Sequence, residues 1–166
     1  MADEHTIERT LRIEASPEVV FGFLTDPDRM SQWMGIGAEL DPRPGGIFRC
    51  AMVHRGIFAC GEFVEVDRPR RVVFTWGWQG SDRLVPPGST RVEFTLRRDR
   101  DGTVLNLCHS GIPIGHDAFH AFGWTFYLGR LAEVFADRDP GPDEWDTETQ
   151  AEFRAAVAAL PRLVSN

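Results

Sequence analysis

The stretch GHDAFHAFGWTFYLGRLAEVF, residues 115–135, decides the fold of this chain. Apolar residues recur in it every three or four positions, which predicts a long helix that begins near Gly115 or His116 and ends by about Phe135. They form two stripes on roughly opposite faces of that helix: Trp124, Leu128, Leu131 and Phe135 on one, and Phe119, Phe122 and Phe126 on the other. A helix that is apolar on two faces is covered on both, so we expect a sheet on one face and a further segment on the other.

The chain before this helix alternates apolar and polar residues, which is the pattern of strands with one solvent-exposed face. Such runs lie at residues 5–14, 36–41, 48–54, 57–66, 72–78, 92–96 and 105–109. Two short helices follow the first strand, one starting at Ser16-Pro17-Glu18 and one near Asp26-Pro27. This order predicts an α+β fold in which a curved antiparallel sheet wraps around the long C-terminal helix. An internal cavity is expected wherever the inward side chains do not fill the space between them.

A length of 166 residues fits one domain with a sizeable core. We expect that domain to span residues 1–138, and residues 139–166 to form a C-terminal extension. We predict that the extension forms one helix from about Asp143 to Ala159. This helix would pack on the same domain and cover the second face of the long helix. The apolar stripe of this helix consists of Phe153, Val157 and Leu160. A homodimer interface is the alternative cover.

Composition and charge exclude several classes of partner. The net charge is −7 and the 18 positive residues, all Arg, are scattered along the chain, so we expect no nucleic-acid partner. No run reaches the roughly 18 apolar residues of a membrane span, so we expect a cytoplasmic protein with no membrane partner. Three cysteines without a CxxC pair, and no phosphate-loop, dinucleotide or GxSxG motif, predict no metal and no cofactor.

A series of short motifs carries a family resemblance. They are RIEASPEVVF at residues 12–21, PGGIF at 44–48, PRRVVFTW at 69–76 and HAFGW at 120–124. Over about residues 5–136 the chain resembles the START-like (SRPBCC) superfamily. More closely, it resembles bacterial homologues of the C-terminal domain of the heat-shock-protein-90 ATPase activator. The resemblance implies the helix-grip fold, an internal cavity and small-molecule ligands, and the family name records a co-chaperone relationship.

The predicted ligand-binding residues point inward from the strands or lie on the inner side of the helices. They are Trp33, Phe48, Met52, His54, Trp76, Trp78, Phe94, His109, Trp124 and Tyr127. His54 and His109 are the candidate catalytic residues, because each ends an apolar strand and histidine titrates near neutral pH. A histidine held by one backbone hydrogen bond is the alternative for both. Trp78 and Tyr127 are stronger pocket candidates than Trp124, which fits the core equally well, because a buried indole or phenol group needs a polar partner.

Three other polar residues have competing interpretations. His116 and His120 lie four residues apart, a spacing that would let two imidazoles share a metal ion. The residues between them do not match HExxH and no third ligand is evident, so a pair of polar residues at a helix start is favoured. Glu62 precedes Phe63 and Val64, which makes the face of its strand ambiguous, and we expect it to be exposed.

Three functions from different classes are consistent with this sequence. Binding of a small hydrophobic molecule in the internal cavity is favoured, because apolar strand faces closed by a long helix suit a concave, mainly apolar site. An aromatase or cyclase acting on a polyketide-like or aromatic substrate is the first alternative, so enzymatic activity is left open although non-enzymatic binding is preferred. A co-chaperone or other protein-binding domain is the second alternative, with the acidic stretch Asp137–Glu152 as its candidate docking surface and a chaperone as its partner.

Overall fold

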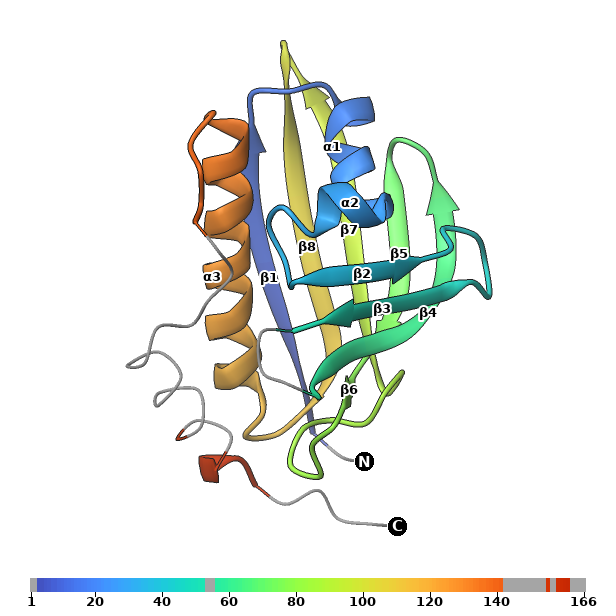
Figure 1. Ribbon diagram of the computed structural model, residues 1–166, viewed down its shortest axis with the longest axis vertical. Helices are drawn as coiled ribbons and strands as arrows, with labels where there is room; N and C mark the ends of the chain where they lie inside the picture. The colour runs from blue at the N-terminus through green and yellow to red at the C-terminus, as the bar shows by residue number, and fades with distance from the viewer. Residues whose placement is uncertain (1–2, 53–55, 142–154, 156–157, 162–166) are drawn as a thin grey trace.

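The computed structural model describes residues 3–52, 56–141, 155 and 158–161. They form an eight-stranded antiparallel sheet in the order β1-β8-β7-β5-β4-β3-β2, and β6 pairs with β4 outside that path. The strands are β1 (Glu4–Ile13), β2 (Gly37–Leu40), β3 (Ile47–Ala51), β4 (Phe58–Asp67), β5 (Arg71–Trp76), β6 (Trp78–Gln79), β7 (Thr90–Asp99) and β8 (Gly102–Pro113). Figure 1 shows the sheet curving so strongly that β2 and β3 cross in front of β7 and β8. The predicted α+β fold with a curved antiparallel sheet is confirmed.

The helices are α1 (Pro17–Thr25), α2 (Pro27–Met30) and the long α3 (Asp117–Phe135). The two short helices begin as the sequence predicts. The side chain of Ser16 accepts a hydrogen bond from the N–H of Val19, and that of Asp26 accepts one from the N–H of Arg29. Figure 1 shows α3 lying alongside β1, at one side of the curved sheet. Among the described residues, no helix is long and apolar enough to cross a membrane.

The predicted strand at residues 72–78 is interrupted at Gly77. The chain passes so close to Pro86 there that a Cβ on Gly77 would lie 1.6 Å from the Pro86 carbonyl oxygen. Beyond the break, Trp78 pairs with β4, and its backbone N–H donates to the Val85 carbonyl at 2.7 Å. Trp76 and Trp78 both remain buried, so the interruption bends the sheet without turning either indole outward.

The core lies between the concave face of the sheet and α3, and aromatic rings fill most of it. Phe48 and Phe74 stack with their ring centroids 4.0 Å apart, and both are fully buried. From α3, the side chains of Trp124, Leu128 and Leu131 are buried against them, as the first predicted stripe requires. Because large side chains occupy most of the interior, little empty space remains inside the sheet.

The chain that follows α3 contacts both ends of that helix. The Arg130 guanidinium donates to the carbonyl oxygens of Trp33, Pro140 and Gly141, each at 3.0 Å. At the other end, His116 Nε2 donates to the Pro161 carbonyl at 3.1 Å. Leu160, from the predicted apolar stripe of the extension, is buried. The rest of the predicted stripe, Phe153 and Val157, and most of the predicted helix Asp143–Ala159 lie outside the described residues.

Candidate functional site

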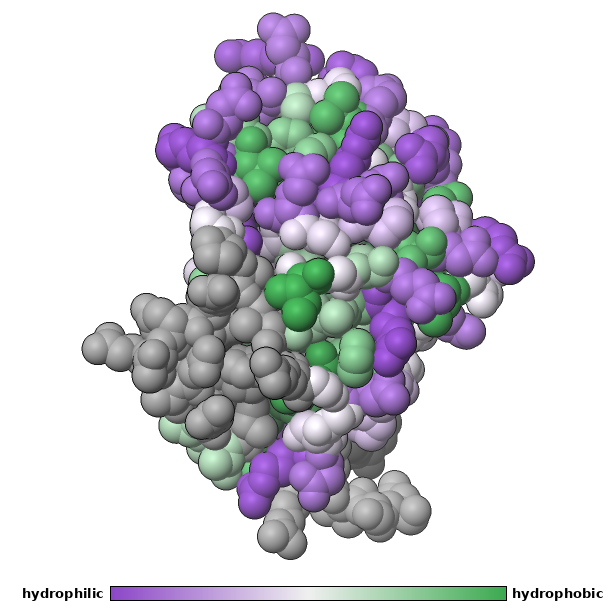
Figure 2. All heavy atoms as spheres, viewed as in Figure 1, coloured by the Kyte–Doolittle hydropathy of each residue, from purple (hydrophilic) through white to green (hydrophobic). Residues whose placement is uncertain are grey.

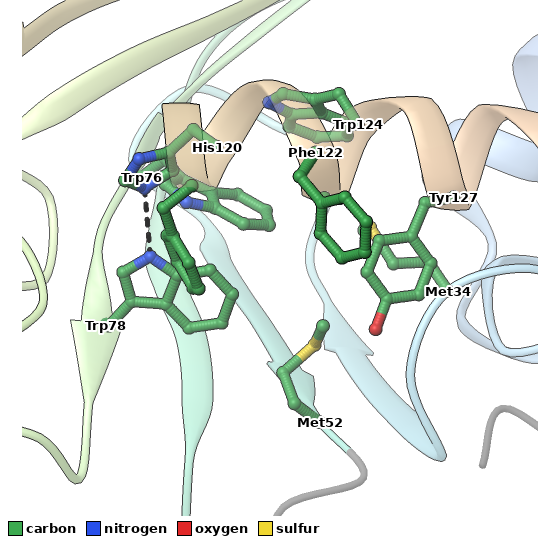
Figure 3. A pocket seen from close by; sticks show the side chains of 10 residues that line it. Met34, Met52, Trp76, Trp78, His120, Phe122, Trp124 and Tyr127 are labelled. Atoms are coloured by element: carbon green, nitrogen blue, oxygen red, sulfur yellow. Dashed lines mark hydrogen bonds between the residues drawn. The ribbon is translucent and has the colours of Figure 1, made fainter. Parts of the chain in front are cut away.

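A pocket of about 40 Å³ lies between the inner face of α3 and the strands that curve toward it. Its lining residues are Met34, Met52, Trp76, Trp78, Phe119, His120, Phe122, Gly123, Trp124 and Tyr127. Figure 3 shows the α3 side chains on one side of this space, with Met52 and Trp78 opposite them. The volume would hold one or two water molecules, and is well below the roughly 300–1,000 Å³ typical of ligand sites. The internal cavity expected from the sequence is therefore small in this conformation.

The mouth of the pocket is apolar and partly covered by Phe122. The side chain of Phe122 is 48% exposed, and Ile36, just before β2, is 65% exposed. Figure 2, which has the same view as Figure 1, shows an apolar area in the middle of this side of the molecule, between α3 and β2. Because about half of Phe122 is already in contact with solvent, rotating it away would widen the pocket at a small cost in buried apolar area.

One side of the pocket is an indole–imidazole pair. His120 Nδ1 lies 2.7 Å from the His116 carbonyl oxygen, which can only accept, so Nδ1 carries the proton. The other ring nitrogen, Nε2, then accepts the indole N–H of Trp78 at 3.1 Å, the contact drawn as a dashed line in Figure 3. Both nitrogens of His120 are thus occupied in its neutral form.

A second indole–imidazole pair lies deeper in the core. The indole Nε1 of Trp124 donates to His109 Nδ1 at 2.9 Å, which places the His109 proton on Nε2. His109 Nε2 donates to Thr90 Oγ1 at 2.7 Å, and Thr90 Oγ1 donates to the Trp76 carbonyl at 2.9 Å. Both ring nitrogens of His109 and the hydroxyl of Thr90 therefore have hydrogen-bond partners. His109 is completely buried, and the centroids of the two imidazole rings lie 5.1 Å apart.

Burial keeps both imidazoles neutral. Burial, with a smaller contribution from the neighbouring His120, lowers the pKa of His109 from 6.5 to about 3. Burial likewise lowers the pKa of His120 to about 4, against the opposing effect of its bond to the His116 carbonyl. Protonation of either ring would also convert its accepting nitrogen into a donor. That donor would face an indole N–H, which cannot accept a hydrogen bond. Neither histidine is suited to take up a proton near neutral pH.

Trp76 contributes the remaining indole of the pocket. Its ring lies 5.3 Å from that of Trp78 and 5.3 Å from that of Trp124. Its Nε1 is buried and has no hydrogen-bond partner among the described residues. None of the described lining residues is Asp, Glu, Lys or Arg, so the pocket is mainly apolar, and the Trp76 indole in its lining carries an unpaired donor.

The predicted ligand-binding residues divide into three groups. Met52, Trp76, Trp78, Trp124 and Tyr127 line the pocket. The buried residues Trp33, Phe48, Phe94 and His109 do not line it. Trp33 donates its indole N–H to the carbonyl of Phe23, in α1, at 3.0 Å. His54, the other candidate catalytic residue, lies outside the described residues.

Sequence reasoning missed several residues of the pocket. They are Met34, Phe119, His120, Phe122 and Gly123. His120 lies four residues before Trp124 on the same side of α3, so helical spacing could have found it, whereas Phe119, Phe122 and Gly123 are not three or four residues from Trp124. Gly123 adds room because no heavy atom of a described residue lies within 4 Å of where its Cβ would be.

The structure also gives the positions of the other polar residues considered in the sequence, His116, His120 and Glu62. His116 and His120 direct ring nitrogens to different partners, and the described residues contain no group of three or more side chains able to hold a metal ion. Glu62 is exposed on β4, and the register of β4 against β5 shifts between Phe63 and Glu65. That irregularity explains the ambiguous alternation at Phe63 and Val64.

Comparison with known proteins decides the family. A model of the family described as "Activator of Hsp90 ATPase homolog 1-like protein" matches residues 14–136. The chain belongs to this family. The AHSA1-like protein of Rhizobium etli is 42% identical over 86% of this chain and 89% of its own length, with a TM-score of 0.65. The START-like assignment made from the sequence motifs is confirmed.

Two further structures similar to this AHSA1-like chain come from different settings. An HSP90 activator of Plasmodium falciparum is 25% identical over 80% of this chain and 96% of its own, with a TM-score of 0.62. DynU16, a protein of the dynemicin biosynthetic locus, is also 25% identical, with a TM-score of 0.68. That match covers 83% of this chain but only 50% of DynU16. No curated protein matches the sequence.

Proposed function

We propose that this protein binds a small, neutral, mainly apolar molecule between α3 and the β5–β6 segment. The observation that carries the proposal is the lining of the pocket, where aromatic rings and the flexible methionines Met34 and Met52 surround a space without a charged side chain among the described residues. Ligand sites are concave and mostly apolar, with few polar groups that set orientation. The exposed Phe122 at the mouth supplies an apolar entrance.

The size of the pocket limits the ligand to about one ring. A ring-sized molecule needs more than the 40 Å³ present, so binding requires side chains to move. Phe122 is 48% exposed at the edge of the pocket, and methionine adapts its shape readily because its unbranched side chain has three rotatable bonds. We therefore expect a planar single-ring molecule to bind, and larger ring systems to bind more weakly.

The test uses α-methylstyrene, a neutral planar hydrocarbon, as the probe and methionine methyl groups as reporters. Met34 and Met52 line the pocket, whereas Met30 is fully buried in the core and serves as a control in the same spectrum. In the full chain labelled with ¹³C-methyl methionine, titration should shift the Met34 and Met52 signals to saturation and leave Met30 in place. An absence of saturable shifts would contradict the proposal.

A matched pair of glycine variants on α3 locates the binding. Gly123 lines the pocket and Gly129 does not, and no heavy atom of a described residue lies within 4 Å of a Cβ built at either. Gly123→Leu should block the pocket and abolish the methionine shifts, while Gly129→Leu should retain them. Both changes favour the helix equally, so a difference in binding cannot come from helix propensity. Equal binding by the two variants would place the probe elsewhere.

Stimulation of a chaperone ATPase is the second candidate function. It is supported by the family description and by the similarity to the Plasmodium falciparum HSP90 activator. The test is the steady-state ATPase rate of purified bacterial Hsp90 with increasing amounts of this protein. A saturable rise in rate would support this function, and an unchanged rate would remove it.

Aromatase or cyclase chemistry has weaker support. The similarity to DynU16, a protein of the dynemicin biosynthetic locus, is what favours it. Against it, the ring nitrogens of His109 and His120 are both occupied and their pKa values are too low for a base at neutral pH. A cyclase activity that persisted unchanged in His109→Gln and His120→Gln variants would need other catalytic residues.

A further inference from the structure

The indole N–H of Trp76 differs from the two neighbouring indoles of the cluster in having no hydrogen-bond partner among the described residues. The side chain is 3% exposed, and Nε1 is buried with no hydrogen-bond partner among the described residues. The neighbouring indoles of Trp78 and Trp124 each donate to an imidazole nitrogen, at 3.1 and 2.9 Å. Figure 3 shows the Trp76 ring between the Trp78–His120 pair and Trp124.

No polar group of the two histidines can serve Trp76. In His120, one ring nitrogen accepts from Trp78 and the other donates to the His116 carbonyl. In His109, one accepts from Trp124 and the other donates to Thr90. The ring nitrogens of both histidines are therefore occupied, and the N–H of Trp76, a ring that lines the pocket, has no partner among the described residues.

An unsatisfied buried donor is unusual, and its position points to a ligand. Nearly all buried donors in native proteins have partners, and one without a partner destabilises the folded state by an amount comparable to a lost hydrogen bond. A water molecule needs two to four polar partners to stay in a buried site. The aromatic and methionine side chains of this pocket offer few, so an acceptor atom carried by an otherwise apolar ligand fits the site better.

We propose that Trp76 sets the specificity of the pocket by donating its indole N–H to an uncharged oxygen of the ligand. The ligand class is then a planar aromatic molecule bearing a carbonyl oxygen. This inference rests on the proposed binding function and deepens it. An anionic oxygen is disfavoured, because the described lining residues include no Arg or Lys and both nearby imidazoles are neutral.

The experiment compares three probes of nearly equal shape. Acetophenone carries a carbonyl oxygen, α-methylstyrene replaces that oxygen with a CH₂ group, and benzoate replaces the ketone with a carboxylate. We expect acetophenone to bind roughly 3- to 10-fold more tightly than α-methylstyrene, the factor that one net neutral hydrogen bond contributes. Benzoate should bind more weakly than either. Dissociation constants come from the Met34 and Met52 methyl shifts described above.

The indole signals of the wild-type protein provide a direct readout of the bond. In a ¹H–¹⁵N spectrum, acetophenone should move the Trp76 Nε1–H proton signal downfield as a new acceptor arrives, whereas α-methylstyrene should not. The Trp33 indole, which already donates to the Phe23 carbonyl outside the pocket, is the internal control. This measurement needs no variant, so it holds even if replacement of Trp76 weakens folding.

Trp76→Phe removes the donor and keeps an aromatic ring. The variant should bind acetophenone and α-methylstyrene equally, because neither probe then meets an indole donor, and the ratio of the two dissociation constants in each protein is the readout, whatever the smaller ring does to both affinities. Equal binding of the two probes by the wild-type protein would overturn the role of Trp76 and leave apolar binding intact. Failure of both probes to bind would overturn the proposed function together with this inference.

Discussion

The two Trp–His pairs of this protein use the same chemistry in different surroundings. Trp124 and His109 are sealed in the core, where Thr90 and the Trp76 carbonyl complete their hydrogen bonds. Trp78 and His120 form the wall of the pocket, and only the His116 carbonyl completes theirs. In both pairs an indole N–H occupies the nitrogen that a general base would need. A buried Trp–His pair thus serves packing in one place and lines a pocket a few ångströms away.

Replacing each histidine by alanine should give the largest difference in the free energy of unfolding between the two pairs. His109→Ala should lower the free energy of unfolding by about 3–5 kcal/mol, because it leaves a closed cavity and strands the Trp124 donor. His120→Ala should lower it by about 2 kcal/mol, because the space it vacates joins the pocket. Urea unfolding at neutral pH measures both values. Equal losses would mean that the two pairs are energetically the same.

Lowering the pH should destabilise the folded protein, because both buried imidazole rings are neutral in it. The folded pKa values, about 3 for His109 and about 4 for His120, lie below the ordinary 6.5, so the unfolded chain binds more protons between pH 6.5 and about 4. Stability therefore falls as the pH drops through this window, by about 1.4 kcal/mol per pH unit for each histidine once the unfolded chain is protonated.

His120→Gln isolates one of these two contributions. Urea unfolding at about pH 7, 6 and 5, at constant ionic strength, should give a shallower pH dependence in the variant by close to one proton. The carboxylate of Glu133, whose pKa is lowered by its bond to Arg138, titrates below 4.5 and so outside the upper part of this window. A variant with the wild-type pH dependence would show that His120 is protonated in the folded protein.

Truncating Phe122 should have the smallest effect on stability and a useful effect on binding. Since the side chain is 48% exposed, Phe122→Ala should cost less than about 1 kcal/mol. Phe119→Ala should cost more, because Phe119 packs against His120 and Trp78 at centroid distances of 5.2 and 6.1 Å. Phe122→Ala should also bind α-methylstyrene more tightly in the methionine-shift titration, since the pocket is already open. Weaker binding would identify Phe122 as a wall that holds the probe.

The strands and α3 could be predicted because a period of two or of 3.6 is written directly in the order of the residues. The same periods fixed which side chains face inward, and Trp76 and Trp78 were found in that way. A strand period does not say how far along the strand a pocket extends. Phe48 and Phe94 point to the same interior and yet lie among packed rings away from the pocket.

The rest of the site depends on contacts between distant parts of the chain. The Trp78–His120 bond joins residues 42 positions apart, and no local pattern pairs them. The two-stripe description of α3 also placed Phe119 and Phe122 on the face opposite Trp124, whereas these residues and Trp124 all line the pocket. A pocket at the boundary between two helix stripes requires the position of the sheet, which periodicity alone does not supply.

The spacing of the indoles makes the pocket its own optical reporter. Trp76 lies 5.3 Å from Trp78 at an interplanar angle of 86° and 5.3 Å from Trp124 at 45°. At such separations the electronic transitions of the rings couple, so the cluster absorbs polarised light as a unit rather than as independent chromophores. The near-ultraviolet circular dichroism of this protein should respond to small rotations of any one ring. Occupants of the pocket could thus be screened without a label, by a signal that surface binding leaves unchanged.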